Sequence, residues 1–138
     1  MVCLLDKKYV LLIFLLIGLA DASYLTFAHF TNTQLYCSNS GIINCQAVTT
    51  SKFSTVIGIP IALLGLVWFV VAIIAFAAIP KLLVPWQYLG ILGMVYSVSS
   101  MAVLGEICEY CSLLDLMLLS SAMMVLAFGI GVKGKSNE

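Results

Sequence analysis

The segment Gly105-Glu106-Ile107-Cys108-Glu109-Tyr110-Cys111-Ser112 joins two long runs of apolar residues. One run ends near Leu104, and the other begins at Ser112. Each run has about 20 residues, which is the length that a helix needs to cross the hydrocarbon core of a membrane. We therefore expect the segment to be a short connection at a membrane surface, with its Cys-x-x-Cys pair at the start of a spanning helix.

The composition of the whole chain is that of an integral membrane protein. Of its 138 residues, 63% are hydrophobic and 9% are charged, whereas about 25% are charged in a soluble domain. The formal net charge is zero and the chain contains no arginine. Nothing in this balance indicates a nucleic-acid partner.

Four apolar runs are long enough to span a membrane, and they cover residues 9–30, 57–79, 86–104 and 112–132. The first is too long for the apolar core of a signal peptide, roughly 7–15 residues, so we expect it to be retained. Pro60 lies in the expected first turn of the second run, where a missing N–H costs little. The sequence therefore predicts an all-α, four-transmembrane-helix bundle that forms one domain, residues 1–138.

The connections between the predicted spans differ in length. Residues 31–56 form a long loop rich in Asn, Ser, Thr and Gly, with a short helix expected around residues 50–55. Residues 80–85, bounded by two prolines, are expected to form a tight turn. The connection that carries the Cys-x-x-Cys pair is also short.

The lysines predict the orientation in the membrane. An even number of spans places both termini on one side, together with five of the six lysines: Lys7, Lys8, Lys81, Lys133 and Lys135. The positive-inside rule then makes this side the cytoplasm. Cys37 and Cys45 in the long loop, and Cys108 and Cys111, are expected on the extracytoplasmic, oxidising side. Cys3 is expected to be a free thiol in the cytoplasm.

The two cysteine pairs suggest more than structural disulfides. A bridge between Cys108 and Cys111 closes a very small loop and stabilises little, while the N-terminus of a helix favours a thiolate there. Cys37 and Cys45, taken alone, are typical of a stabilising loop disulfide. Together, the pairs suit electron transfer by thiol–disulfide exchange. Their spacing is not that of zinc knuckles, so we predict no metal site.

The order of these features resembles the vitamin K epoxide reductase family. The matching features are Cys37 and Cys45 separated by seven residues, then Ser51, then Gly58-Ile59-Pro60 at a span, then Cys108-x-x-Cys111 at the last span. The resemblance covers nearly the whole chain, from the first span to the last. It implies a stand-alone homologue of the prokaryotic type, in the cell or inner membrane.

The resemblance also implies a role for each cysteine. Cys111 would interact with a quinone, and Cys108 would exchange with the loop. Cys45 would be the loop partner of Cys108, and Cys37 would meet the electron donor outside. The implied activity is that of a thiol:quinone oxidoreductase, which passes electrons from an extracytoplasmic thioredoxin-like protein to a quinone of the ubiquinone, menaquinone or vitamin K type and so supports disulfide formation.

Two positions depart from the vertebrate members of the family. Those members have a Tyr four residues after the second active-site Cys and an Asn near the second span, and both hydrogen-bond the quinone. Asp115 and Ser54 stand at these places here and are expected quinone contacts. Asp115 also completes a capping box with Ser112, and Ser54 is also interpreted as a loop or cap residue.

Two further polar residues lie in the first span. A carboxylate within a membrane indicates function, so Asp21 is interpreted either as a group for proton uptake or as a hydrogen-bond partner of the polar residues 96–100. His29, at the outer end, is interpreted as an interfacial residue or as a proton relay. Two alternative functions remain open: reduction of vitamin K epoxide by the same relay, and a non-enzymatic four-span scaffold with structural disulfides.

Overall fold

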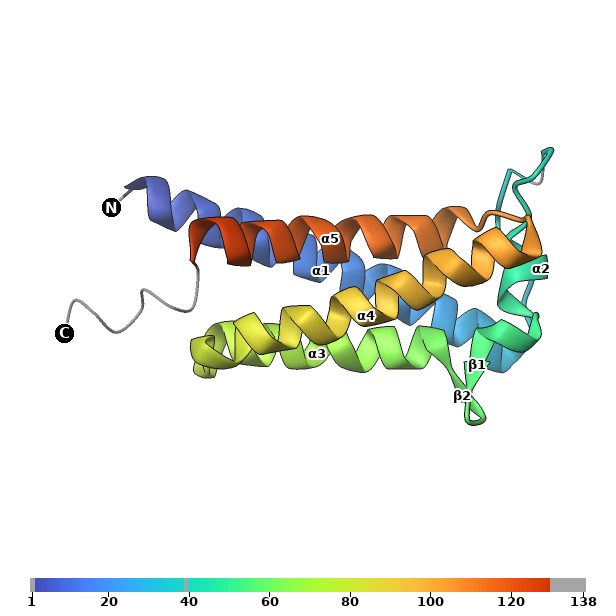
Figure 1. Ribbon diagram of the computed structural model, residues 1–138, viewed down its shortest axis with the longest axis horizontal. Helices are drawn as coiled ribbons and strands as arrows, with labels where there is room; N and C mark the ends of the chain where they lie inside the picture. The colour runs from blue at the N-terminus through green and yellow to red at the C-terminus, as the bar shows by residue number, and fades with distance from the viewer. Residues whose placement is uncertain (1, 39, 130–138) are drawn as a thin grey trace.

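The computed structural model describes residues 2–38 and 40–129, and four long helices make up most of it (Figure 1). They are α1 (Val2–Thr31), α3 (Ile61–Ala78), α4 (Pro80–Leu104) and α5 (Glu109–Phe128). All four are long and apolar enough to cross a membrane, with mean hydropathies between 1.4 and 2.8 over their most apolar windows. The prediction of a mostly helical chain with four candidate spans is confirmed.

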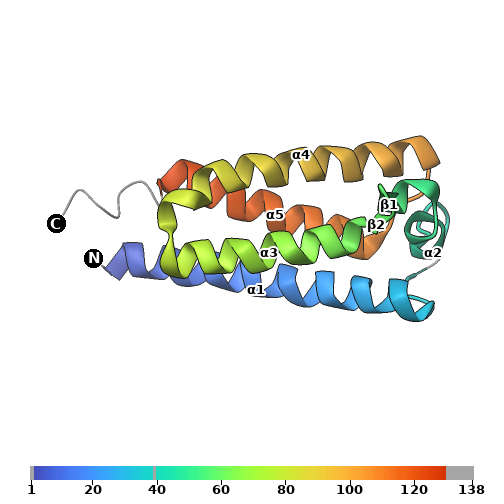
Figure 2. The ribbon, with the colours of Figure 1, turned by 90° about the horizontal axis from the view of Figure 1, so that it is seen from below.

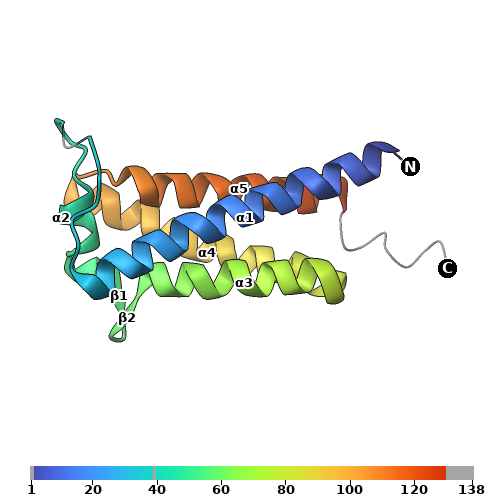
Figure 3. The ribbon, with the colours of Figure 1, turned by 180° about the vertical axis from the view of Figure 1, so that it is seen from behind.

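The helices form a bundle in which each one packs against two others. α1 contacts α3 and α5, and α4 contacts the same two helices (Figures 2 and 3). The start of α1 and the end of α5 lie at the same end of the bundle, where the Lys7 ammonium lies 3.9 Å from the centre of the Phe128 ring. Close contacts need small residues on one side: a Cβ at Gly18 would lie 2.3 Å from the Phe69 ring.

The chain between α1 and α3 covers the other end of the bundle (Figure 1). It contains the short helix α2 (Cys45–Thr49), the 3-10 helix η1 (Lys52–Ser54) and a hairpin of β1 (Thr55–Val56) and β2 (Ile59–Pro60). In the hairpin, Thr55 pairs with Pro60 and Val56 with Ile59 in antiparallel register. The short helix expected around residues 50–55 therefore corresponds to η1, and α2 precedes it.

The second long helix begins later than predicted. Ile57 and Gly58 have φ values of 55° and 80° and form the turn of the hairpin, a conformation that cannot continue into a right-handed helix. Pro60 is consequently the N-cap of α3, with extended backbone angles, and not a residue of its first turn. The expected span 57–79 shortens to Ile61–Ala78.

The expected tight turn at residues 80–85 is wrong, because α4 already begins at Pro80. Proline fits the first position of a helix, where its N–H would have no partner. Pro85 lies inside α4 and removes one backbone hydrogen bond without ending the helix. Only Ile79 separates α3 from α4. α5 begins at Glu109, three residues before the expected start, and residues 130–132 of the predicted fourth span lie outside the described residues.

Buried apolar side chains form two clusters along the bundle. The inner cluster contains Leu11, Leu15, Ala22, Trp68, Phe69, Ala72, Ala75, Leu83 and Val125. The outer cluster lies under the covering segment and contains Leu25, Ala28, Leu35, Cys45, Val48, Met101 and Cys108. Two of the predicted functional cysteines are thus part of the outer core.

Candidate active site

Cys37 and Cys45 form a disulfide with a Cα–Cα distance of 6.2 Å. Cys37 lies half-buried in the irregular chain that follows α1, and Cys45 is the fully buried first residue of α2. The side chain of Asn44 caps α2 by accepting a hydrogen bond from the Ala47 N–H at 3.1 Å. This cap fixes the direction in which α2 starts, and hence the position of Cys45.

A short parallel bridge brings this disulfide to the start of α5. The Asn44 N–H donates to the Ile107 carbonyl at 2.9 Å, and the Ile107 N–H donates to the Ile42 carbonyl at 2.7 Å. The residue after Asn44 is Cys45, and the residue after Ile107 is Cys108. Both thiol positions are completely buried in the outer cluster. The bridge therefore helps to bring Cys45 and Cys108 into one buried cluster, against which Cys37 and Cys111 are also packed.

Two side-chain hydrogen bonds attach the segment around Cys37 to the first turn of α5. The Ser38 hydroxyl donates to the Glu109 carboxylate, and the Tyr110 hydroxyl donates to the Tyr36 carbonyl. The Tyr110 ring also packs against Tyr24 of α1, with 5.2 Å between ring centres. These contacts hold the disulfide segment over the Cys-x-x-Cys motif. Sequence reasoning missed them, since no local pattern marks a partner so distant in the chain.

Cys108 is the N-cap of α5, as expected for a cysteine pair at the start of the last span. Its Sγ accepts the Cys111 backbone N–H at 3.3 Å. A hydrogen bond from the Cys111 thiol is the strongest influence on Cys108 and lowers its pKa, although burial acts in the opposite direction. Both cysteines are free thiols. The arrangement favours a Cys108 thiolate, which is the form that attacks disulfides.

An apolar cavity of about 570 Å³ lies next to Cys111. Its wall is built from α1, the covering segment, α3, α4 and α5, and it runs from Ser54 and Phe53 at the covered end to Trp68 and Trp86. Cys111 is half-buried and lines it, whereas Cys108 does not. A cavity of this size and apolar character is typical of a site for a flat organic molecule.

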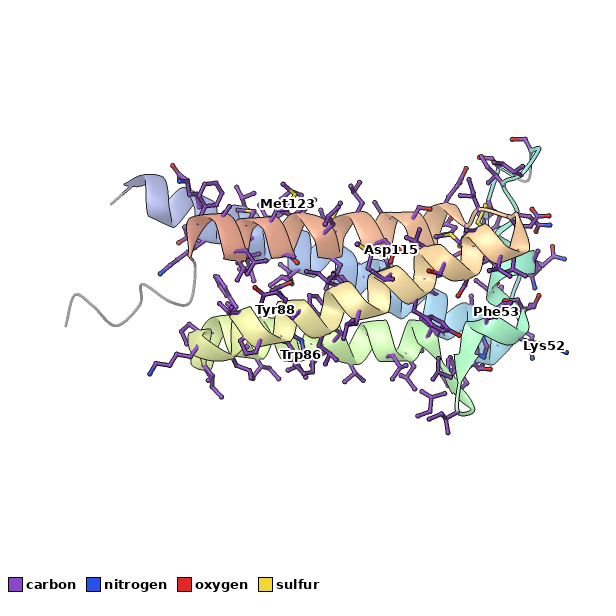
Figure 4. The ribbon with its side chains drawn as sticks, in the orientation of Figure 1. Lys52, Phe53, Trp86, Tyr88, Asp115 and Met123 are labelled. Atoms are coloured by element: carbon purple, nitrogen blue, oxygen red, sulfur yellow. A yellow bond between two sulfur atoms is a disulfide. The ribbon has the colours of Figure 1, made fainter. Side chains whose placement is uncertain are left out.

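Asp115 lies one helical turn beyond Cys111 on the same cavity wall. Its Oδ2 accepts a hydrogen bond from the Ser97 hydroxyl of α4 at 2.9 Å, and Figure 4 shows it on the α5 side of the space between these helices. The predicted capping box is wrong, because α5 begins at Glu109 and Cys108 caps it. The Ser112 hydroxyl instead contacts the Met101 sulfur at 4.0 Å.

Ser54, the other predicted quinone contact, lies in η1 and lines the cavity. Its hydroxyl donates to the Ser51 carbonyl at 2.7 Å, and the Ser51 hydroxyl donates to the Val48 carbonyl at 2.8 Å. Both hydroxyls therefore close turns, and both residues border the cavity. Ser54 therefore lies in the loop between α1 and α3, as one of its two interpretations expected, and it lines the same cavity as Asp115.

Asp21 does not use the partners that the sequence offered. Ser97 donates to Asp115, and Ser100 donates to the Tyr96 carbonyl at 2.8 Å. The Asp21 carboxyl is 9% exposed, and its Oδ2 has no hydrogen-bond partner among residues 2–38 and 40–129. The expected interhelical hydrogen bond is thus absent from this part of the chain. The side chain of Cys3 lies outside what the structure describes.

The two tryptophans join α3 to α4. Each indole N–H donates to the other residue's carbonyl, Trp68 at 3.1 Å and Trp86 at 3.0 Å, so they act as packing residues, and both also border the cavity. Within the described residues, no cluster of three His, Cys, Asp or Glu side chains is placed to hold a metal ion.

The fold and the site define a class: a four-helix membrane protein with two cysteine pairs at one end and an apolar cavity beside one of them. The sequence model of the vitamin K epoxide reductase family matches residues 9–128, and the chain therefore belongs to that family. Its members are generally membrane oxidoreductases that use quinones and thioredoxin-like partners. Searches of curated proteins and of solved structures returned no match.

Proposed function

We propose that this protein is a thiol:quinone oxidoreductase whose electrons pass through Cys37, Cys45, Cys108 and Cys111. The observation that carries the proposal is that the two thiols of the Cys-x-x-Cys motif have different surroundings. Cys108 is buried in the same cluster as Cys45 and does not line the apolar cavity, whereas Cys111, packed at the edge of that cluster, does line the cavity. One thiol of the pair is therefore placed for disulfide exchange and the other for contact with a lipid-soluble acceptor.

The cavity residues fit a quinone. The walls are almost entirely apolar, which suits a ring and a prenyl tail, and Asp115 and Ser54 add polar groups to them. A bound quinone supplies an acceptor for two electrons and two protons. Cys111 borders the space that such a ring would occupy, and its distance along α5 from Asp115 is one turn.

The proposed relay balances at each step. A reduced partner gives two electrons to the Cys37–Cys45 disulfide, and its own two thiols become a disulfide. Cys45 then attacks Cys108 of an oxidised Cys108–Cys111 pair, which releases the Cys111 thiolate. Cys37 attacks Cys45, which restores the loop disulfide and releases Cys108. The two thiols at the start of α5 are then oxidised to a disulfide as the acceptor is reduced.

The partner and the membrane orientation follow from the same proposal. A thioredoxin-like protein is aqueous, so it must reach Cys37 from outside the membrane. Cys37 is the half-buried member of the disulfide, and its neighbours Tyr36 and Ser38 are hydrogen-bonded to α5. We place both termini in the cytoplasm and both cysteine pairs outside it. In this orientation the relay supports disulfide formation in exported proteins.

Trapping the exchange intermediate tests the relay. Cys111→Ser removes the thiol that resolves a Cys45–Cys108 disulfide from the helix side, so we expect this cross-link to accumulate in the membrane. After digestion, the cross-link is detected as two joined peptides whose Cys45 and Cys108 thiols are alkylated only after a reductant is added. Cys3→Ser is the matched control and should leave the loop disulfide unchanged. A variant with only the Cys37–Cys45 disulfide under all redox conditions would contradict the relay.

A second experiment separates the enzyme from a structural scaffold. Purified protein is mixed with a reduced thioredoxin-like protein and a soluble ubiquinone or menaquinone analogue, and quinone absorbance is followed. We expect reduction that is lost when any one of the four cysteines is replaced by serine. If the absorbance does not change, or changes without the cysteines, the protein is not a thiol:quinone oxidoreductase and the structural scaffold is favoured.

A further inference from the structure

A second, smaller cavity lies beside the first at the covered end of the bundle. Its volume is about 340 Å³, between the end of α1 and the segment from α2 to β1. In contrast to the apolar cavity, most of its lining residues carry hydroxyl, amide or imidazole groups: His29, Asn32, Thr33, Gln46, Thr49, Thr50, Ser51, Ser54 and Thr55. A roomy cavity with this many polar partners is suited to hold water.

The two cavities share part of their walls. Five residues line both of them: Leu25, His29, Thr49, Ser51 and Ser54. Among the shared residues, His29 is the only one with a titratable side chain. The other titratable groups on the wall of the apolar cavity are Tyr96 of α4 and Cys111 and Asp115 of α5, and none of these lines the polar cavity.

We propose that the polar cavity is the proton entrance of the site and that His29 passes protons from it to the acceptor in the apolar cavity. The inference rests on the proposed function and adds a proton donor to it. Imidazole is suited to this task because it exchanges protons near neutral pH. His29 is half-buried at the end of α1. It lines both the polar cavity and the apolar cavity.

The proton balance of the reaction requires such a donor. When Cys108 and Cys111 form their disulfide they lose two electrons, and the quinone takes up those electrons and two protons. Cys108 does not line the apolar cavity, so only the Cys111 thiol can give its proton there directly, and this accounts for one of the two. The second must come from water, and the apolar cavity has few polar groups through which water could supply it.

The polar groups on the wall of the apolar cavity lie in two places. Asp115 and Ser97 lie where α4 meets α5, whereas His29, Ser51 and Ser54 lie on α1 and the covering segment. Because only the second group borders the polar cavity, His29 rather than Asp115 connects to the outside.

The test compares His29→Gln, which keeps a polar side chain of similar length but removes proton exchange, with Phe27→Leu. Phe27 is 63% exposed on α1 and lines neither cavity. Quinone reduction by reduced partner is measured between about pH 6 and 8 in water and in deuterium oxide. We expect His29→Gln to lower the maximal rate about tenfold or more, to flatten the pH profile and to change the solvent isotope effect. Phe27→Leu should match the wild type.

Two further measurements separate proton transfer from structural damage. His29→Gln in the Cys111→Ser background should still form the Cys45–Cys108 cross-link, which reports an intact relay. In His29→Ala, added imidazole should restore the rate as its concentration rises, since the polar cavity has room for it. A wild-type rate and isotope effect in His29→Gln would overturn the proton role while leaving the relay standing. No cysteine-dependent quinone reduction by the wild type would overturn both.

Discussion

At the scale of single residues, the hydrogen bond from Ser97 to Asp115 determines the chemistry of the cavity wall next to Cys111. The Ser97 hydroxyl of α4 lies 2.9 Å from the Asp115 Oδ2 of α5. The bond holds the carboxyl group on the cavity wall. A polar group in an otherwise apolar wall orients whatever binds there.

We predict that Asp115→Leu weakens quinone reduction. The substitution removes one hydrogen-bonding group from the proposed site, a loss of about 1.4 kcal/mol and hence about tenfold in rate at low quinone concentration. The measurement is the dependence of the rate on quinone concentration. Ser112→Ala is the control, because the Ser112 hydroxyl is directed to the Met101 sulfur and Ser112 does not line the cavity. Equal rates in Asp115→Leu and the wild type would exclude Asp115 as a quinone contact.

The pH dependence of Cys108 provides a second prediction for a single residue. The hydrogen bond from the Cys111 thiol lowers the pKa of Cys108, so the thiolate persists to a lower pH than in an ordinary cysteine. Cys111→Ala removes this donor, and the thiolate should then appear only at higher pH. Thiolate ultraviolet absorbance during titration measures the change, with Cys3, Cys37 and Cys45 replaced by serine in all proteins so that Cys108 stays a free thiol.

Cys111→Ser gives the matched comparison for that titration. A serine hydroxyl still donates a hydrogen bond to the Cys108 sulfur, so its titration should lie between those of the wild type and Cys111→Ala. The backbone N–H of residue 111 donates in all three proteins. A shift of Cys111→Ala toward lower pH would show that the thiol does not stabilise the Cys108 thiolate.

At the scale of the elements, two tryptophans and a glycine set the contact between α3 and α4. Trp68 and Trp86 exchange indole-to-carbonyl hydrogen bonds, and their rings stack at 6.5 Å. Gly90 lies against this pair: a Cβ there would come within 2.6 to 2.8 Å of the Trp68 ring. The two helices can approach this closely only because residue 90 lacks a side chain.

We predict that Gly90→Ala destabilises the bundle and that Gly93→Ala does not. At residue 90 the added methyl group overlaps the buried Trp68 ring, which costs about 1–3 kcal/mol. At residue 93 nothing lies within 4 Å of an added Cβ, and alanine favours a helix by about 1 kcal/mol over glycine. Thermal unfolding of both variants in detergent measures the difference. A Gly90→Ala variant as stable as Gly93→Ala would contradict this packing.

The boundaries of the elements show where local reasoning failed. Apolar composition alone extended the second span back to residue 57, but the positive φ angles of Ile57 and Gly58 form a hairpin turn there. Two prolines suggested a turn at residues 80–85, yet one occupies a permitted helix start and the other is tolerated within α4. The backbone conformation at residues 57–58 and 80–85 depends on the surrounding packing, and the amino-acid composition does not specify that packing.

At the scale of the whole molecule, the bundle has two chemically different ends. One carries the disulfide segment, the Cys-x-x-Cys motif, the polar cavity and the part of the apolar cavity next to Cys111. The other carries Lys7 at the start of α1 and the connection between α3 and α4 (Figure 1). Lys81 lies in the first turn of α4 at this second end. Lysine on the second end supports our placement of it in the cytoplasm.

Labelling with a membrane-impermeant maleimide tests this orientation. Gln34→Cys and Lys81→Cys are each introduced into a protein whose native cysteines are replaced by serine, and both positions are exposed. We expect residue 34 to react in intact cells and residue 81 to react only after permeabilisation. The reverse pattern would place the cysteine pairs in the cytoplasm and contradict the proposed partner.

The sequence alone indicated the family, the four helices and the two cysteine pairs, because apolar runs and motif spacing are local properties of the chain. The tertiary structure adds that Cys111 lines the apolar cavity and that Cys108 is buried in a cluster with Cys45. The bridge between Asn44 and Ile107, the Ser97–Asp115 hydrogen bond and the two adjoining cavities all join residues far apart in the chain. Such contacts form when the helices pack, so no local pattern predicts them.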